Sequence, residues 1–258
     1  FNLVLAVLFI GPLPALAGLV EWLVPEPDAS TDPSAPIYLD AAAISTPSLA
    51  LTCAARETLH MGDLIETMLR RSIGALMTDD RRLVIEIERM DNLVDRLHEA
   101  IKLYVTKITR ESLDEAESRR AMEIIACAIN FEHVGDIIDK NLMELATKKI
   151  KNRLSFSDSG AAELQAFHRR VLDSLKLAFT VFMSGDVKVA RQLVEEKVVI
   201  REAERAAAEN HLERLRNGLT ASVETSSLHL DILRYVAIAD EAVEMDTILL
   251  LRAANRTH

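Results

Sequence analysis

The sequence contains few of the residues that interrupt helices or cross-link small folds. Its 258 residues include 8 Gly, 7 Pro and 2 Cys, and only 4% are aromatic. So few helix breakers leave room for long helices, and the low aromatic content indicates packing through aliphatic side chains. Two cysteines, Cys53 and Cys127, do not make a disulfide framework for a chain of this length, which favours a reducing, cytosolic setting.

Clustered positive charge and catalytic motifs are also missing. The formal net charge is −10, and no Lys or Arg precedes Arg56, so the positive-inside rule cannot orient a membrane span near the N-terminus. Nucleic acid binding is disfavoured, because it depends on gathered Lys and Arg. The chain shows no glycine-rich phosphate loop, nucleophile elbow or paired-cysteine zinc spacing. We therefore expect no enzymatic activity.

An apolar block opens the chain. Phe1–Val20 has no charged side chain, and about 20 apolar residues suffice to cross a hydrocarbon core of roughly 30 Å as a helix. We expect one transmembrane helix over residues 1–24 and, from its Pro, Asp, Ser and Ala content, a linker over 25–45. A helix docked in a soluble core remains an alternative. Because the first residue is Phe, we expect the natural protein to begin upstream.

Long amphipathic helices fill the rest of the sequence. Capping residues and turns predict six of them, at about 47–77, 80–108, 113–150, 161–183, 187–217 and 222–253. In the second, apolar residues from Leu83 to Ile108 recur in steps of four and three, which is typical of bundle packing. A shift of 106 residues superposes the turn at 77–80 on that at 183–186. We expect an all-α fold with two three-helix repeats, 46–153 and 154–254.

Acidic residues lie one position beyond three of those apolar positions. Glu88, Asp91 and Asp95 share one flank of the second helix, and Glu132, Asp136 and Asp139 share a face of the third. Antiparallel packing would bring these carboxylates within a few ångströms, where like charges raise one another's pKa and destabilise the bundle unless a cation neutralises them. Mg²⁺, Mn²⁺, Ca²⁺ or iron suits such ligands, with His98 and His133 nearby. The alternative is two solvated helix flanks.

The second repeat does not preserve this acidic flank. The same shift carries Glu88, Asp91 and Asp95 onto Val194, Lys197 and Arg201. His211 and its acidic neighbours alternate with arginines such as Arg214, which predicts ion pairs within one helix. His229 fits a position at the edge of the core better than a metal ligand.

Several stretches resemble a known family. The opening Phe1-Asn2-Leu3, the apolar block and Leu23-Val24-Pro25 resemble the last membrane helix of bacterial Na⁺/phosphate cotransporter family proteins. The remainder resembles the PhoU-like domain that many of these transporters carry at the C-terminus. The supporting segments are 131–136 (FEHVGD), similar to the PhoU ExxxD metal motif, 201–205 (REAER), 209–215 (ENHLERL) and 224–234 (ETSSLHLDILR).

This resemblance implies the C-terminal portion of a sodium-dependent phosphate transporter in the bacterial inner membrane, with a cytoplasmic regulatory PhoU-like bundle. It implies that a divalent or trivalent metal ion (Mg, Mn or Fe) binds a site formed by Glu88, Asp91, Asp95, Glu132 and Asp136. Sodium and phosphate would bind in membrane helices upstream of Phe1, and that membrane domain would be the partner of the bundle. A homodimer is compatible with this resemblance.

Two other functions also fit the residues. One is a membrane-tethered PhoU-type signalling adaptor without transport activity. The other is a plain helical scaffold whose acidic flanks are merely solvated.

Overall fold

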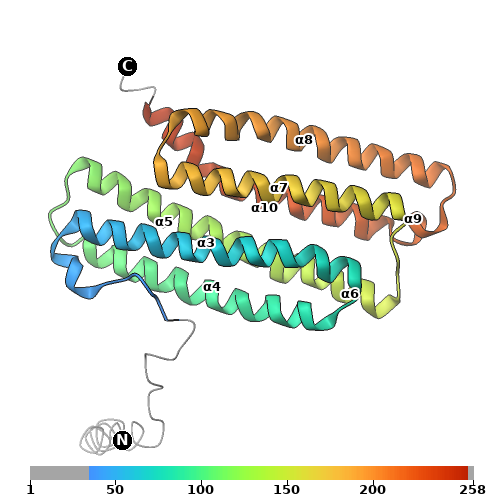
Figure 1. Ribbon diagram of the computed structural model, residues 1–258, viewed down its shortest axis with the longest axis horizontal. Coiled ribbons are helices and arrows are strands. Elements are labelled where there is room, and N and C mark those ends of the chain that lie inside the picture. The colour runs from blue at the N-terminus through green and yellow to red at the C-terminus, as the bar shows by residue number, and fades with distance from the viewer. Residues whose placement is uncertain (1–34, 255–258) are drawn as a thin grey trace, which may run out of the picture. The chain divides into compact units, whose positions relative to one another are not determined.

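The computed structural model describes the backbone of residues 35–254 and the side chains of residues 35–242. This part of the chain is helical, as Figure 1 shows, which confirms the all-α prediction. The predicted membrane helix at 1–24 and the linker residues 25–34 lie outside the described residues. Among the helices that are described, none combines the length and the apolar character that crossing a bilayer requires.

Six long helical stretches follow one another, near the predicted positions. The elements are η1 (Ala41–Ser45), α3 (Pro47–Thr78), α4 (Arg81–Ile108), α5 (Glu115–Asp136), η2 (Ile137–Met143), α6 (Glu144–Asn152), α7 (Asp158–Ser184), α8 (Val187–Arg216), α9 (Thr220–Glu224) and α10 (Ser226–Ala254). The predicted last helix differs, because it is divided at Thr225. At this position the Thr225 hydroxyl donates to the Ala221 carbonyl, 2.7 Å away, and α9 ends at Glu224 while α10 begins at Ser226.

The helices pack in two sets of three (Figure 1). One set comprises α3, α4 and the continuous stretch α5–η2–α6, and the other comprises α7, α8 and α10. The sets meet where α3 packs on α7 and α5 packs on α10. They correspond in sequence to the repeats expected at 46–153 and 154–254, whose status as repeats stays a prediction.

Polar side chains fix where the helices begin. Asp80, Asp114, Ser157 and Asp186 each accept a hydrogen bond from a backbone N–H in the first turn that follows. Such caps satisfy donors that have no partner inside the helix, and each contributes about 1 kcal/mol. Gly185 ends α7 with a φ of 60°, a left-handed conformation that glycine adopts without strain. Turn chemistry therefore explains why the predicted boundaries lie close to the observed ones.

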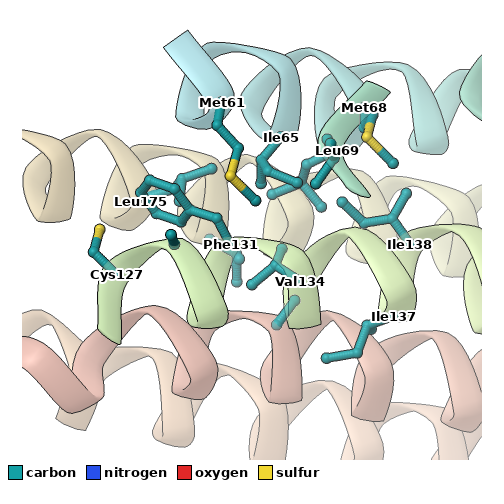
Figure 2. Close-up of a cluster of buried hydrophobic side chains, with 14 of the residues drawn as sticks. Met61, Ile65, Met68, Leu69, Cys127, Phe131, Val134, Ile137, Ile138 and Leu175 are labelled. Atoms are coloured by element: carbon teal, nitrogen blue, oxygen red, sulfur yellow. The ribbon is translucent and has the colours of Figure 1, made fainter. Parts of the chain in front are cut away.

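The main core lies between α3, α5 and α7 (Figure 2). Met61, Ile65 and Leu69 of α3 lie against Phe131 of α5, and all four side chains are almost fully buried. The Phe131 ring meets Phe179 of α7 edge to face, with centroids 5.3 Å apart. Burying each such side chain contributes about 1.5–3 kcal/mol. This packing holds α5 in place, and α5 carries part of the candidate site.

The end of the predicted linker lies against the bundle. We call residues 37–46 the strap. Its Tyr38 N–H donates to Glu57 on α3, 2.5 Å away, and the Tyr104 hydroxyl of α4 donates to the Asp40 carbonyl, 2.6 Å away. Apolar side chains of the strap, among them the buried Ala43, pack on the core. Residues 37–45 of the linker expected over 25–45 therefore pack on the bundle, because the apolar side chains of Leu39, Ala43 and Ile44 contact the core.

A π-helical segment interrupts the third long helix. η2 covers Ile137–Met143 and continues α5 directly into α6. A π turn closes hydrogen bonds from residue i to i+5 and changes which side chains face a neighbour, and such turns are frequent at functional sites. The uninterrupted helix expected at 113–150 misses this feature. Its effect is to alter the register of the acidic residues that follow Asp136.

Candidate metal centre

Helix α4 presents two carboxylates one turn apart. Asp91 and Asp95 are four residues apart, so they project from the same face of the helix. Ile87, Val94 and Leu97 of α4 are buried and bind this helix to its neighbours. Asp91 lies within that buried row, with 6% of its surface exposed, whereas Asp95 is exposed. Sequence periodicity had placed Asp91 beside the apolar row; the structure places it inside.

Helix α5 supplies a third carboxylate from its last residue, Asp136. One carboxylate oxygen each of Asp91, Asp95 and Asp136 lies within 4.8 Å of the other two. The close approach depends on Gly135, because a Cβ atom there would lie only 2.9 Å from Asp91 Oδ1. Contacts that short do not occur between unstrained atoms, so any larger residue would push against the Asp91 carboxylate. Glycine therefore lets α5 approach α4 closely enough to assemble the group.

The buried carboxylate lacks a full set of partners. Asp91 Oδ1 has no hydrogen-bond partner. Burial raises the pKa of Asp91 from 3.8 to about 7, and the charges of Asp139, Asp95 and Asp136 add to the effect. An unpaired buried carboxylate is costly, and a protein relieves that cost by protonation or by a bound cation. Asp91 is thus poised to accept a positive charge.

A cleft of about 580 Å³ opens beside this group. Glu88 and Asp139 line it together with Asp91 and Asp95. Burial also raises the pKa of Asp139, and the Glu88 charge is the next cause. Asp139 Oδ1 is a second buried oxygen without a hydrogen bond. Asp139 lies three residues after Asp136, about one helical turn further on, and so adjoins the same acidic site.

The five residues predicted from sequence are not all brought together. Asp91, Asp95 and Asp136 converge, and Glu88 lines the adjoining cleft. Glu132, one turn before Asp136 on α5, is neither in the converging group nor in the cleft lining. The candidate histidines, His98 and His133, are also outside both sets. Asp139, noted in the sequence for its shared face, has the better position.

The residues present fit a hard cation. Three convergent carboxylates with a buried, unpaired oxygen match the oxygen ligands that Mg²⁺, Mn²⁺ and Fe ions take. Lys140 of η2 already pairs with Asp136 at the edge of the group. In the part of the chain that the structure describes, this is the one cluster of at least three His, Cys, Asp or Glu side chains spaced for a metal.

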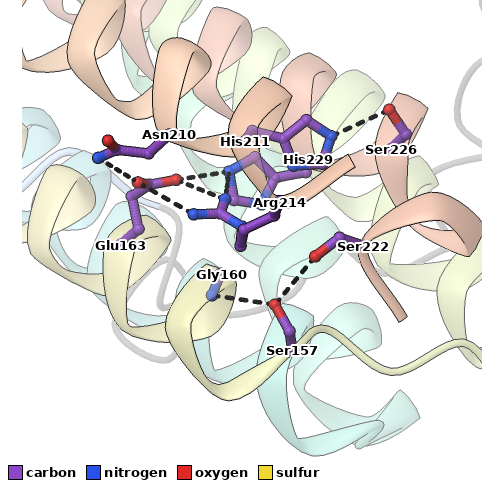
Figure 3. Close-up of polar contacts among 9 residues, drawn as sticks. All are labelled: Ser157, Gly160, Glu163, Asn210, His211, Arg214, Ser222, Ser226 and His229. Atoms are coloured by element: carbon purple, nitrogen blue, oxygen red, sulfur yellow. Dashed lines mark hydrogen bonds and ion pairs between the residues drawn. The ribbon is translucent and has the colours of Figure 1, made fainter. Parts of the chain in front are cut away.

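A second polar cluster joins α7, α8 and α10 (Figure 3). Glu163 accepts hydrogen bonds from Arg214 at 2.8 Å and Asn210 at 3.0 Å, and it lies 3.0 Å from His229 Nε2. The His211 ring stacks on His229 with centroids 4.5 Å apart, and its Nε2 lies 2.9 Å from Ser226 Oγ. This network crosses three helices and gives the second set of helices a specific register.

The network changes one sequence expectation. His211 and Arg214 were expected to form ion pairs within one helix, which is wrong, because Arg214 pairs with Glu163 of α7 and His211 is 1% exposed. Burial lowers the pKa of His211 to about 4, and the nearby His229 and Arg214 charges add to this effect. The core-edge role expected for His229 agrees with its burial. The network joins residues of three helices that are far apart in the sequence, so spacing within one helix could not predict it.

Comparisons with known proteins agree with this helical architecture. Residues 58–144 match the PhoU domain family. The fold is similar to that of PhoU from Pseudomonas aeruginosa, with a TM-score of 0.71, 17% identity and coverage of 80% of this chain and 97% of that one. It is also similar to the phosphate transport system regulatory protein PhoU from Streptococcus pneumoniae, with a TM-score of 0.71, 15% identity and coverage of 82% and 98%. The predicted PhoU-like bundle is confirmed.

Curated relatives share more sequence. A protein of Escherichia coli O157:H7, provisionally named inorganic phosphate export protein YjbB, is 39% identical over 236 residues, which cover 90% of this chain and 43% of the relative. The Salmonella typhimurium protein of the same name is 40% identical over 198 residues, which cover 77% and 36%. The chain thus spans less than half the length of these relatives. Residues 58–144 thus resemble a PhoU domain, and the chain is similar to proteins named for phosphate export.

Proposed function

We propose that this chain is the C-terminal part of a phosphate transport protein, in which the PhoU-like bundle regulates transport and binds a metal ion. The ligands are Asp91, Asp95 and Asp136, with Glu88 and Asp139 lining the approach. One observation carries the metal proposal. It is the buried Asp91 carboxylate, whose Oδ1 lacks a hydrogen bond while two further carboxylates converge on it.

The transport proposal rests on the relatives and on the apolar start of the chain. The relatives are named for phosphate export and are more than twice as long as the segment that matches. In this proposal residues 1–24 form the last membrane helix of a bacterial inner-membrane protein, and the bundle lies in the cytoplasm. Phosphate is the transported anion and sodium the coupling ion, both bound by the preceding membrane domain, which is also the partner of the bundle.

The proposed mechanism is a shift between two states of the bundle. A divalent cation at the cluster cancels repulsion between carboxylates of α4 and α5 and so favours the arrangement in which these helices are close. That arrangement and its alternative differ in how they dock against the membrane domain. Metal occupancy then biases transport by the difference in metal affinity between the two states.

The metal site is tested with purified chain in mild detergent. Mn²⁺ binding to the Asp91→Asn variant is expected to be weaker by at least about 10–100-fold, because a direct ligand contributes no less than the outer-shell groups whose loss costs about 10–100-fold. Glu132→Gln is the matched control, since it removes one negative charge from α5 outside the converging group. Equal Mn²⁺ affinity in wild type and Asp91→Asn would refute the site and favour a solvated scaffold.

The regulatory role is tested in the full-length protein. Phosphate flux is measured in cells for wild type, for Asp91→Asn and for a deletion of residues 46–258, with sodium and with sodium replaced by potassium. Altered flux or altered response to phosphate supply in the two variants supports regulation, and loss of flux without sodium supports the coupling ion. Unchanged flux and regulation in the deletion would contradict the proposal. A full-length protein that moves no phosphate would instead favour the membrane-tethered adaptor.

A further inference from the structure

Lys140 lies at the entrance of the acidic group and already acts as a cation there. It projects from η2, and its ammonium pairs with the carboxylate of Asp136, four residues earlier. A π turn closes hydrogen bonds from residue i to i+5, so side chains four residues apart, such as those of Asp136 and Lys140, lie close together. The same positive charge also acts on Asp91, Asp95 and Asp139. One lysine thus offsets part of the repulsion of the whole cluster.

The ion pair between Lys140 and Asp136 is weak enough to open. The Lys140 side chain is 62% exposed, whereas Asp91 beneath it is buried. A long, flexible lysine stem can turn its charged end into water with little loss, since exposed pairs of this kind contribute about 0–1 kcal/mol. The ammonium can therefore leave Asp136 when another cation arrives, and the three carboxylates then become available together.

We propose that Lys140 is a tethered competing cation that determines which ions the site accepts. This inference rests on the proposed metal site. A sodium or potassium ion has the same charge as the ammonium, so replacing Lys140 gains no attraction and costs the ion its hydration shell. A divalent ion brings twice the charge to the same carboxylates, and its attraction is correspondingly larger. Lys140 therefore excludes monovalent ions and raises the divalent concentration that fills the site.

The test compares Mn²⁺ binding to the full chain with Lys140→Met and Lys140→Gln. Lys140→Met keeps most of the side-chain length, Lys140→Gln keeps the polarity, and both remove the competing charge. We expect Mn²⁺ to bind about tenfold more tightly, as for loss of one nearby unit charge at the protein surface. Lys148→Met is the control, because Lys148 is an exposed lysine of α6 outside the cleft lining. It should change the affinity by no more than about twofold, through long-range screening alone.

A competition experiment reads the selectivity directly. In wild type, raising NaCl or KCl at fixed Mn²⁺ should weaken binding only as much as in the Lys148→Met control. In Lys140→Met, monovalent ions should compete further, because the tethered charge no longer excludes them. An unchanged Mn²⁺ affinity and salt response in both Lys140 variants would overturn the inference, as would an equal gain in Lys148→Met.

The two proposals fail in different ways. Absence of Mn²⁺ binding in wild type and in the Lys140 variants would refute the metal site and this inference together. Tight, Asp91-dependent binding in wild type that does not respond to Lys140 would leave the site standing and refute the role of the lysine. Helical circular dichroism of each variant checks that the bundle is folded, which is expected because Lys140 is exposed.

Discussion

The buried Asp91 carboxylate should make the metal-free protein less stable as pH rises. Its folded-state pKa is about 7 against an ordinary 3.8, so the folded state holds the proton more tightly than the unfolded state. Stability from this group is therefore fully present below pH 3.8 and is lost as pH rises through about 7. Asp91→Asn removes the ionisation but keeps the shape, so it should stabilise the metal-free bundle at pH 8.

The size of the effect follows from the pKa difference. At about 1.4 kcal/mol per pH unit, the rise corresponds to about 4 kcal/mol as an upper bound, and relaxation of the site should reduce this to about 2–4 kcal/mol. Urea unfolding with a chelator at pH 5 and pH 8 measures it. Because the unfolded state already releases this proton above pH 3.8, the loss at pH 5 is about 1.7 kcal/mol on the same upper-bound scale. The gain for Asp91→Asn should therefore be less than half as large at pH 5 as at pH 8.

Adding metal should remove most of the stability difference between the two proteins. A ligand that binds only the folded state at 100 times its dissociation constant contributes about 2.7 kcal/mol to wild type, and the Asp91→Asn variant largely lacks this gain because it binds metal more weakly. The Glu132→Gln control should follow wild type in both conditions. If Asp91→Asn were less stable than wild type in chelator at pH 8, or if the difference did not depend on pH, the reasoning about a costly buried charge would be refuted.

Three further changes test other parts of the structure. Gly135→Ala should destabilise by about 1–3 kcal/mol in urea unfolding and weaken Mn²⁺ binding, because the new Cβ presses on Asp91; unaltered binding would contradict this. Glu163→Gln should cost about 3–5 kcal/mol at pH 7, since it leaves Arg214 partly buried without its carboxylate; a loss below about 1 kcal/mol would show that the pair is dispensable. Tyr104→Phe should cost about 1 kcal/mol and speed amide hydrogen exchange in the strap, and unchanged exchange would exclude the anchoring role.

The second polar cluster adds acid sensitivity of the opposite sign. Burial alone would raise the pKa of Glu163, but hydrogen bonds from His229, Arg214 and Asn210 outweigh it and lower the pKa to about 2. The stability from Glu163 is present above its ordinary 4.5 and is lost as pH falls towards 2. The pKa of His211 is lowered from 6.5 to about 4, so the stability that this group contributes is lost as pH falls from 6.5 to about 4. Wild type without metal should therefore be most stable at mildly acidic pH.

The sequence predicted the helices well because their signals are local. The cap at Asp80, the capping box at Asp114 and the glycine at 185 each act over one turn, and each lies where a boundary was expected. Apolar periodicity likewise indicated the buried face of α4. These features depend on neighbours in the chain, so no knowledge of tertiary packing was needed to find them.

The site was predicted only in part, because its remaining details depend on contacts between helices. Spacing identified Asp91 and Asp95, but it could not show that Asp91 is buried while Asp95 is exposed. The predicted set included Glu132 because of its resemblance to the PhoU ExxxD motif, whereas Asp139, which lines the cleft, was noted only for its shared face. The Glu163 network involves residues separated by about fifty positions and more, which no single-helix pattern reveals.

The strap fixes residues 37–46 on the bundle. Its hydrogen bonds reach both α3 and α4, through Glu57 and Tyr104, and α4 also carries Asp91 and Asp95. A force applied at residue 36 would therefore act directly on α4, the helix that holds two of the carboxylates. Conversely, a shift of α4 would move the strap and residue 36 with it.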